Sequence, residues 1–476
     1  MAAGVGYRIA IEINKKGAIG QAVERAGNNC ARGGTGGTGG TEPGVEPLAD
    51  LTGLEFVTVD PAGATDLDQA MHLERQADGY RVDYAIADVP GFVAAGGAVD
   101  GEARRRGQTV YAPDQRTPLH PPVLSEAAAS LLPGQVRPAF VWRFDLDATG
   151  AVTHLELVRA HVRSRRQLDY DQVQAAADQP DQHPDLALLA QLLREVGERR
   201  QALELARGGA SLPLPEQEVH TDGDAFSLRL RANLPSEDWN AQLSLMTGIA
   251  AAGLMLTAGT GLLRTMPAPD PGALRRFRDQ TQAAGVPWPA DEPYGAFLRR
   301  LDGHQPAHLA LLFAAAALFR GAGYTPFDGA PPPQPGHAAV AASYAHVTAP
   351  LRRLVDRFGL LCAYHAHRGQ PVPEWVRQAL PGLPAAMSAS DQLAGEVERR
   401  CLDAVEAALL AGRSGEVFEA VVVSVDRDGE DGRVQLVDPP VLARCRGVRT
   451  AGARVQVRLD AAAGSDHAVQ FESVSS

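Results

Sequence analysis

The chain has 476 residues, too many for one ordinary hydrophobic core, so two or three domains are expected. Its net charge of −12 argues against a protein that coats nucleic acid indiscriminately, because such binding relies on phosphate neutralisation. An enzyme with a locally basic channel is still allowed. The four cysteines are far apart and form no CxxC pair, which argues against a disulfide framework or a zinc site and favours a reducing cytoplasm.

The first 48 residues differ in composition from the rest of the chain. A short apolar stretch is followed by ARGGTGGTGGTEPG, whose Gly/Thr repeat is typical of a flexible linker. About 30 residues before a linker is short for an independent domain. We therefore treat 1–48 as a separate N-terminal segment and assign it no function.

Residues 49–411 carry strand patterns first and helical patterns later. Strands are predicted at 54–59, 69–73, 80–89, 138–147 and 151–163, and helices at 171–206, 237–263, 272–284, 306–321 and 349–368. Strands grouped ahead of helices favour an α+β fold over alternating βαβ units.

One helical stretch is apolar enough to suggest a membrane span. Residues 243–263 carry no charge over 21 positions, close to the length needed to cross a bilayer. The stretch stands alone, is diluted by Ser, Thr and Gly, and lacks flanking basic asymmetry. A buried core helix is the favoured interpretation, and no membrane association is expected.

A third sequence pattern occupies 412–476, where about five short strands are predicted close to one another. This rhythm is typical of a small OB-type β-barrel, a common platform for single-stranded nucleic acid. The alternative is a small β module that only mediates contacts, because the segment has few aromatics and more acids than bases.

The sequence TVDPAGATDLDQA (58–70) carries the first candidate site. A strand ends at Asp60, a Pro-Ala-Gly turn follows, and Asp66 and Asp68 come at i, i+2. A turn that folds these carboxylates together would need a cation to offset their repulsion, and oxygen ligands favour Mg²⁺ or Mn²⁺. The spacing alone is equally compatible with an acidic turn that binds no metal.

The second candidate site lies in YAHVTAPLRRLVDRFGLLCAYHAHRG (344–369). Thr348 can cap a helix that Gly369 ends, which places Arg352 and Arg353 at its positive N-terminal end, suited to anionic oxygen. Alternatively, Arg352 pairs with Asp356 at i, i+4 and the site is structural.

These two segments, together with TVYAPDQRTPLHPPVLSEAAASLLPGQVRPAFVWRFDLDATGAV, SRRQLDYDQVQ and the flanks of the aspartate motif, resemble the ribonuclease II (RNB) family in order. The resemblance implies an RNB catalytic domain with a deep RNA channel over 49–411, followed by an S-one-type OB-fold RNA-binding domain at 412–476. It implies a hydrolytic 3′→5′ exoribonuclease that uses Mg²⁺ to release nucleoside 5′-monophosphates from single-stranded RNA.

The resemblance also implies roles for individual residues. Asp60, Asp66 and Asp68 match three of the family's four catalytic, metal-binding aspartates, and Arg352 matches the arginine that neutralises charge on the phosphate. Tyr111 and Tyr170 would contact the terminal nucleotides, unless they are core residues. The arginine motif adds three further RNA-binding candidates: His346, Thr348 and Arg353.

The sequence departs from the family pattern at the fourth aspartate, where Gln69 stands. An amide oxygen can still coordinate Mg²⁺ but brings no charge, so metal affinity should fall. Residues 241–252 lack a Glu-Glu pair that the family often shows, and the N-terminus lacks room for two cold-shock barrels. The channel mouth is then more open, which allows structured RNA with a 3′ end as a substrate.

Two hypotheses from different classes follow. The first is an active, monomeric, cytoplasmic exoribonuclease with an atypical site. The second is a weakened or inactive RNB-fold protein that binds RNA or a partner without cutting it. Retention of Asp60, Asp66, Asp68 and Arg352 favours the first, and Gln69 is the main support for the second. A metal-dependent phosphodiesterase acting on a non-RNA substrate is a third, weaker alternative.

Overall fold

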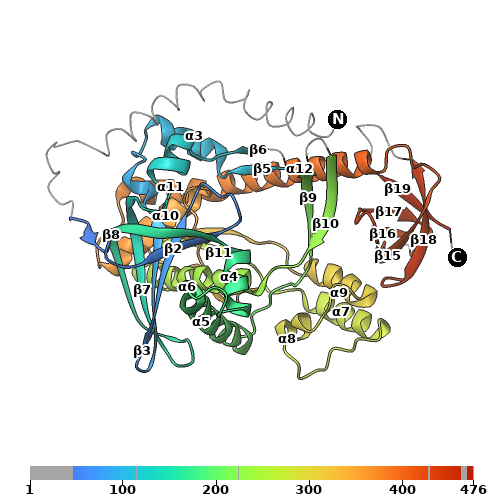
Figure 1. Cartoon of the computed structure of the whole chain (residues 1–476), viewed down its shortest axis with the longest axis horizontal. Coiled ribbons are helices and arrows are strands. Elements are labelled where there is room, and N and C mark those ends of the chain that lie inside the picture. Colours follow the sequence, from blue (N-terminus) through green and yellow to red (C-terminus); the bar gives the residue numbers. More distant parts are fainter. Residues whose placement is uncertain (1–46, 114, 223–224, 427–428, 462–468, 475–476) are drawn as a thin grey trace.

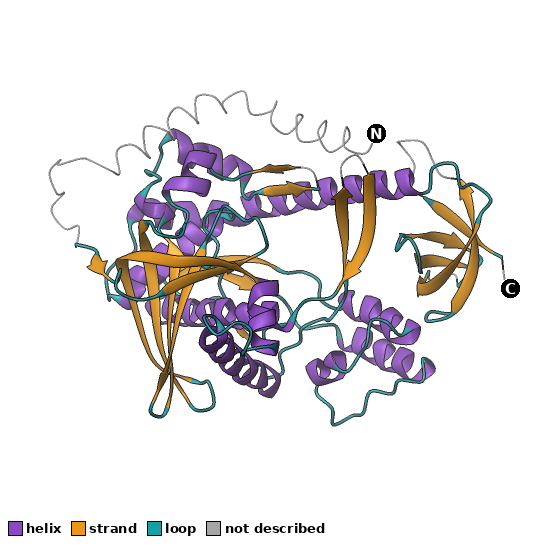
Figure 2. Ribbon diagram, viewed as in Figure 1, coloured by secondary structure: helices purple, strands orange, loops and turns teal. Residues whose placement is uncertain are grey.

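The computed structural model describes residues 47–113, 115–222, 225–426, 429–461 and 469–474 (Figure 1). The predicted linker therefore lies outside the described residues. The mixed α+β class predicted for the body is confirmed, as is the small C-terminal barrel (Figure 2).

The body is built on one curled sheet. Its strands, in spatial order, are β1 (Ala49–Asp50), β8 (Val152–Asp169), β2 (Phe56–Asp60), β3 (Gln69–Gln76), β4 (Gly79–Ala87) and β7 (Val136–Asp147). The long β8 pairs with β7 over its first part and with β2 over its last part, so the sheet closes back on itself. The predicted strands all form.

Alternating side chains of these strands enter two separate cores. Tyr84 and Ile86 of β4 belong to the larger core, whereas Ala85 and Ala87 between them belong to the smaller one. This follows from the period of two in a strand, which sends neighbours to opposite faces. Both faces of the sheet are therefore buried over this strand.

Helices cover the larger core. They are α4 (Tyr170–Asp178), α5 (Ala187–Ala206), α6 (Pro235–Ala258) and α10 (Leu354–His367). The single helix predicted over 171–206 is two helices, because Pro180 and Pro184 interrupt it. The helix predicted over 237–263 ends at Gly259, which caps it in the left-handed region, and the chain continues as a strand.

α6 is the described helix that is long and apolar enough to cross a membrane by length and composition alone. Core helices pass the same test. α6 packs against α5 and α10, and residues such as Leu243, Met246 and Met255 are buried in the larger core. This placement agrees with the interpretation of 243–263 as part of a core helix.

Shorter elements surround the body. They are the helices α3 (Ala98–Arg106), α11 (Glu374–Ala379), η1 (Val89–Gly91), η2 (Leu124–Ala128) and η3 (Leu380–Gly382), and the strand pairs β5 (Val110–Ala112) with β6 (Gln115–Thr117), β11 (Thr260–Thr265) with β12 (Gly323–Asp328), and β13 (Gly336–His337) with β14 (Ala342–Ser343). A separate helical lobe contains α7 (Pro271–Ala283), α8 (Tyr294–Arg299) and α9 (Pro306–Ala316) around an aromatic cluster.

The C-terminal barrel is closed by β15 (Val417–Val425), β16 (Asp431–Leu436), β17 (Leu442–Arg446), β19 (Gln470–Ser473) and β18 (Arg454–Ala461). A long helix, α12 (Leu383–Leu409), runs from the body to this barrel (Figure 1). No helix was predicted there. Its early residue Met387 lies in the body core and its late residue Val405 in the barrel core.

Two further elements hold the barrel. The hairpin of β9 (Glu216–Asp222) and β10 (Ala225–Arg231) contributes Leu228 to the barrel core. On another side, Leu309 of α9 packs with Val421 and Val423 of β15. The barrel is thus fixed to the body through α12, the hairpin and the helical lobe.

Candidate active site

The aspartate motif forms the end of β2, a tight loop and the start of β3. Asp60 closes β2 and Gln69 opens β3. Gly63 has a φ of 79°, in the left-handed region that favours glycine. The buried Leu67 amide donates to Ser130 Oγ at 3.0 Å, which ties the loop to the body. The loop is therefore a fixed platform.

The arginine motif docks directly on this platform. The Leu351 amide donates to Asp68 Oδ1 at 2.7 Å across a sequence separation of 283 residues. Beside it, Gln69 Nε2 donates to the Thr348 carbonyl at 2.7 Å. Two neighbouring loop residues therefore offer one acceptor and one donor to the same turn. The two motifs singled out by the sequence meet at this point.

Residues 348–353 form a turn, so the predicted helix begins later than its pattern indicated. α10 starts at Leu354, with Arg353 as its extended N-cap. The prediction that Thr348 caps the helix is wrong, because backbone amides of the turn bind carboxylates instead. Ala349 donates to Asp356 Oδ1 at 2.6 Å, and Leu351 donates to the aspartate loop.

The two neighbouring arginines have different surroundings. Arg353 donates to both oxygens of Asp356 at 2.8 Å, and its side chain is only 16% exposed. Arg352 Nε lies 3.6 Å from Asp68 Oδ2, and its side chain is 44% exposed. The alternative that Arg352 pairs with Asp356 is wrong, because Arg353 takes that place. Arg352 is the guanidinium that faces solvent beside an aspartate.

Asp60 presents a buried oxygen at the centre of the site. Its Oδ2 has no hydrogen-bond partner among the described residues. Burial raises the pKa of Asp60 to about 7; the charge of Asp66 adds to the rise, whereas Thr58 and Arg352 oppose it. Burial also raises the pKa of Asp68 well above its usual range, against the charge of Arg352. Both carboxyl groups would be ionised more readily beside a cation.

These oxygens fit a magnesium ion with few protein ligands. Within the described residues, no group of three or more His, Cys, Asp or Glu side chains is gathered closely enough to hold a metal alone. Mg²⁺ commonly keeps several waters and takes one or two carboxylates together with substrate phosphate oxygens. The unpartnered Asp60 Oδ2 suits such an ion, whereas zinc prefers nitrogen or sulfur ligands.

Asp66 is held by side chains of the β5–β6 hairpin. Arg116 Nη1 donates to Asp66 Oδ1 at 2.6 Å, and its other terminal nitrogen lies 2.9 Å from Glu126. The Tyr111 hydroxyl lies 3.5 Å from Asp66 Oδ2. Tyr111 is 51% exposed, so the alternative that it is a core residue is wrong. Its ring is free to stack on a ligand.

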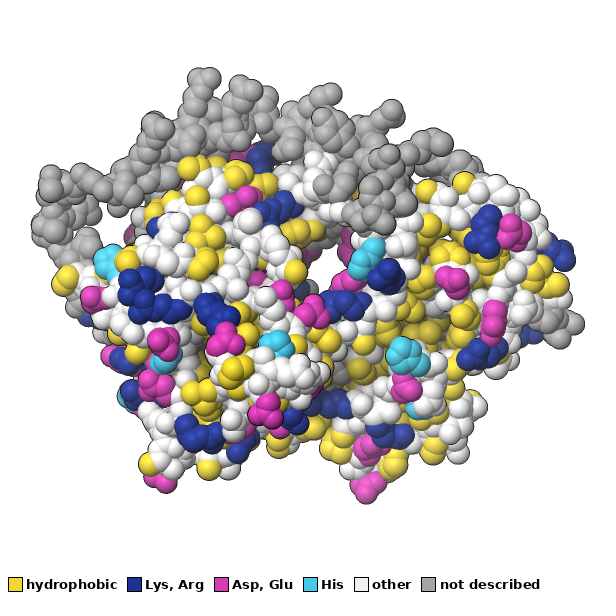
Figure 3. Space-filling view, viewed as in Figure 1, with side chains coloured by type: hydrophobic (Ala, Val, Ile, Leu, Met, Phe, Trp, Pro, Cys, Tyr) yellow, Lys and Arg dark blue, Asp and Glu magenta, His cyan; other side chains and the backbone are white. Residues whose placement is uncertain are grey.

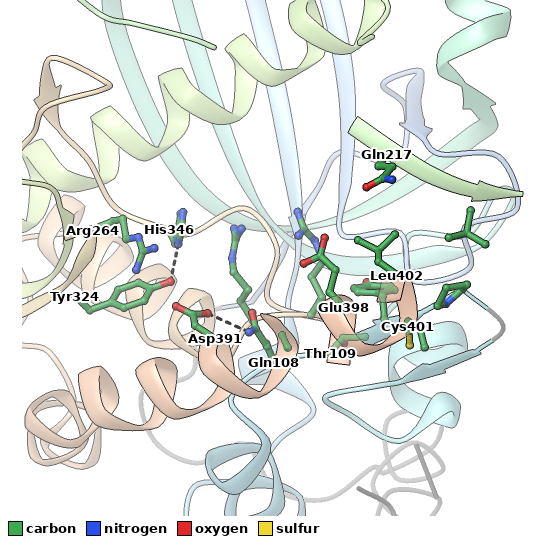
Figure 4. A pocket seen from close by; sticks show the side chains of 17 residues that line it. Gln108, Thr109, Gln217, Arg264, Tyr324, His346, Asp391, Glu398, Cys401 and Leu402 are labelled. Atoms are coloured by element: carbon green, nitrogen blue, oxygen red, sulfur yellow. Dashed lines mark hydrogen bonds between the residues drawn. The ribbon is translucent and has the colours of Figure 1, made fainter. Parts of the chain in front are cut away.

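A cavity of about 640 Å³ opens on one side of the arginine turn (Figure 4). The body lines it with Tyr111 and with the cationic and aromatic set Arg264, Arg352, Arg353, Tyr324 and His346. Asp391 and Glu398 of α12 also line it. The space-filling view shows an opening below α12 and beside the β9–β10 hairpin (Figure 3).

His346 belongs to this wall as a neutral ring. Its Nδ1 and the Tyr324 hydroxyl are 2.8 Å apart, a bond drawn in Figure 4. Burial lowers the pKa of His346 well below its usual range, and the charge of Arg353 acts in the same direction. The Arg264 guanidinium lies over the Tyr324 ring, 4.6 Å from its centroid. The positive charge of the wall therefore comes from the arginines.

A second cavity of about 450 Å³ opens on the other side of the same turn. Arg352 and Arg353 line both cavities. Tyr170 lines the second cavity and packs against the larger core, so it is partly a core residue and partly a cavity residue. Gln69 and Thr348 also border this space. The predicted RNA-binding residues thus line one or both of these cavities, whereas none of the three aspartates is among the lining residues of either.

Several residues of the site were not predicted. Arg264 and Tyr324 face each other across β11 and β12, where no motif marks them. Glu237 and Asn240 project from α6 into the second cavity. Arg116 lies in a segment that the resemblance covered, and its place three residues after Pro113 in YAPDQR was a usable signal.

Two family descriptions match this chain. The RNB domain matches residues 48–358, and the RNase II-type exonuclease C-terminal S1 domain matches residues 416–474. The first match alone covers more than half of the 476 residues. The second coincides with the closed barrel.

Curated and solved proteins agree with these matches. Ribonuclease R of Escherichia coli (strain K12) is 27% identical over 400 residues, which are 79% of this chain and 48% of that protein. The chain spans about half the length, or less, of the curated relatives it matches.

Among solved structures, Mycoplasma genitalium RNase R in complex with ribose-methylated single-stranded RNA has a TM-score of 0.82 at 19% identity, covering 95% of this chain and 75% of that chain. The same protein in complex with double-stranded RNA has a TM-score of 0.78 at 20% identity, covering 95% and 80%. Yeast Ssd1, described as a pseudonuclease, has a TM-score of 0.68 at 16% identity, covering 87% and 53%. At these identities the likeness establishes a shared fold.

Proposed function

Because this chain belongs to the RNB family, we propose that it is a hydrolytic 3′→5′ exoribonuclease that releases nucleoside 5′-monophosphates from RNA. The observation that carries the proposal is the docking of the arginine turn on the aspartate loop. Asp68 accepts from the Leu351 amide at 2.7 Å, and Arg352 lies next to the same carboxylate at 3.6 Å. An arginine and aspartates fixed together, between two cavities, suit phosphoryl chemistry.

The larger cavity is the proposed path of the RNA strand. Arg264 and Arg352 along one wall can neutralise backbone phosphates, and the exposed Tyr111 ring can stack on a base. The second cavity, bordered by Tyr170, is the proposed place of the 3′-terminal nucleotide.

Asp60, Asp66 and Asp68 are the residues that would hold Mg²⁺, or Mn²⁺ in its place. The bound ion would polarise the scissile phosphate and lower the pKa of a water nucleophile. Arg352 would neutralise the charge that the phosphate gains in the transition state. Arg353 fixes the turn through Asp356, while His346 and Thr348 shape the wall and the backbone of the site.

The barrel supplies a second contact surface for RNA. Arg433 of β16 stands opposite Arg444 of β17, and both side chains are exposed. Like charges directly opposite each other are unfavourable unless an anion lies between them. Neither arginine forms an ion pair with another described residue. A phosphate backbone crossing these strands would relieve the repulsion.

An RNA-binding protein with weakened or absent activity is the second candidate. Gln69 replaces a charged ligand, and the fold is shared with a protein described as a pseudonuclease. The fixed Asp68–Arg352 pair argues for the active form, because a scaffold that only binds RNA has no need of it. We also propose that the protein is a monomer and that it is located in the cytoplasm.

The test uses 5′-labelled single-stranded RNA with the full chain, in Mg²⁺, in Mn²⁺ and in EDTA. We expect shortening from the 3′ end and nucleoside 5′-monophosphates in either metal, and neither in EDTA. RNA binding without shortening would favour the second candidate. In a second assay, an RNA duplex with a 3′ overhang tests structured RNA. We expect its overhanging strand to be shortened into the paired region.

A further inference from the structure

Both ends of the Gln69 side-chain amide are engaged within the protein. Nε2 donates to the Thr348 carbonyl at 2.7 Å, and Oε1 accepts from the Tyr84 hydroxyl at 2.8 Å. Tyr84 is fully buried, and its oxygen lies 2.8 Å from Ser244 Oγ. The amide therefore sits between the arginine turn on one side and a buried tyrosine on the other.

The hydrogen-bond directions in this chain are fixed by chemistry. An amide oxygen can only accept, so the Tyr84 hydroxyl hydrogen points to Gln69 Oε1. Ser244 must then donate to the Tyr84 oxygen. The chain of donors runs from Ser244 of α6, through Tyr84 of β4 and Gln69 of β3, to the carbonyl of Thr348. It links three elements of the body to the turn that carries Arg352.

A carboxylate at position 69 could not make this pair of bonds. It could accept from Tyr84, but it has no hydrogen to give to the Thr348 carbonyl, and two oxygens would face each other. Asp68 beside it is the complement, because it accepts from the Leu351 amide of the same turn. Residues 68 and 69 together match the donor and acceptor that the turn presents.

We propose that Gln69 is a positioning residue that holds the Arg352 turn on the aspartate loop, and that it is not a metal ligand. This inference rests on the proposed exoribonuclease function for its meaning in catalysis. Its structural content, that the amide serves the turn instead of a cation, is independent of RNA cleavage. The proposal gives Gln69, which stands where the family pattern has an aspartate, a structural role in this chain.

The first experiment measures metal binding without any activity. The Mn²⁺ dissociation constant of the full chain is determined by electron paramagnetic resonance for wild type and for Gln69→Met, which keeps the length but removes both hydrogen-bonding groups. We expect a change of less than about twofold. A rise of about tenfold or more, the size associated with loss of a metal-supporting group, would overturn the proposal. Gln76→Met, at the other end of β3, is the matched control.

The second experiment asks whether Gln69 acts through Arg352. Gln69→Met should lower kcat about tenfold while the RNA dissociation constant stays within about twofold, because the turn shifts while the cavity remains. In the Arg352→Ala background the same substitution should have little further effect on kcat. If the double variant instead loses kcat by the product of the two single-variant losses, Gln69 and Arg352 act independently, and the proposal is overturned.

Tyr84→Phe provides a second variant should Gln69→Met fail to fold. It removes only the hydroxyl that orients Gln69 Oε1. We expect kcat to fall about threefold with the Mn²⁺ constant unchanged, and an unchanged kcat would overturn the proposed chain. If wild type does not cleave RNA at all, the exoribonuclease proposal fails, whereas the Mn²⁺ measurement still decides whether Gln69 is a ligand.

Discussion

The candidate active site and the C-terminal barrel both present arginines to solvent, but they hold them differently. Arg352 sits on a turn that one buried and one partly buried hydrogen bond tie to residues far away in sequence. Arg433 and Arg444 are exposed residues of two barrel strands, where only the register of β16 and β17 sets them opposite each other. The first arrangement fixes one guanidinium at one place. The arrangement on the barrel only concentrates positive charge on one part of its surface.

This difference predicts two kinds of response to mutation. Substitutions at the centre should change turnover or folding steeply, because each buried bond has one partner and low tolerance. Substitutions on the barrel should change RNA affinity in small, additive and salt-dependent steps.

Asp68→Asn should give the largest effect on turnover. The asparagine Oδ1 can still accept from the Leu351 amide, so the turn stays docked, but the negative charge beside Arg352 is lost. We expect the rate of monophosphate release to fall about a thousandfold. Thermal unfolding should remain within a few degrees of wild type. Cleavage at near wild-type rate would remove Asp68 from the catalytic set.

Arg352 and Arg353 should separate catalysis from folding. Arg352→Ala should lower turnover about a hundredfold with little effect on unfolding, since the side chain is exposed. Arg353→Ala leaves the fully buried Asp356 without its partner and should lower the free energy of unfolding by about 3–5 kcal/mol. Urea unfolding and single-turnover rates on both variants make the comparison, and equal losses of stability would contradict it.

The sequence was sufficient to predict the parts of the molecule that depend on local pattern. Strands of the body and barrel follow from alternation and turn residues, and the two motifs pointed to the residues that meet at Asp68 and Arg352. The motifs work because their chemistry is carried by residue type and spacing. The α+β class follows from the order of strands and helices.

The remaining features depend on contacts between distant segments. The register of β11 against β12 sets Arg264 beside Tyr324, and no local pattern reports it. The start of α10 was predicted too early. The Ala349 amide donates to Asp356 and the Leu351 amide donates to Asp68, so residues 349–353 form a turn instead of the first turn of the helix. The partners of Gln69 were invisible for the same reason. A single sequence does not show which side chain a backbone group will meet.

His120 should make the stability of the centre depend on pH. It is 1% exposed, and its Nε2 lies 3.3 Å from the Pro350 carbonyl in the arginine segment. Burial lowers the pKa of His120 to about 3, and the charge of Arg357 acts the same way. The unfolded chain binds a proton near pH 6.5, so stability is complete above that value and declines as the pH falls toward 3.

At pH 5 this single group should cost about 2 kcal/mol of the free energy of unfolding relative to pH 7.5. His120→Gln keeps a donor for the Pro350 carbonyl but does not titrate. Urea unfolding at both pH values should therefore show a smaller pH dependence in the variant, by about that amount. The same pH dependence in both proteins would mean that His120 is protonated without cost in the folded state.

The barrel arginines should show the mildest response, and a paired neighbour provides the control. Arg433→Ala and Arg444→Ala should each raise the dissociation constant for single-stranded RNA about threefold at low salt, with kcat unchanged. Each should also reduce the slope of log affinity against log salt by about 0.7, the value for one phosphate contact on a single strand. Arg454 is already paired with Glu419 at 2.7 Å, so Arg454→Ala should change neither quantity. If all three substitutions weaken RNA equally, the barrel acts through net charge and not through the Arg433–Arg444 surface. If none does, RNA does not cross these strands, and the arginines of the cavity must provide the affinity.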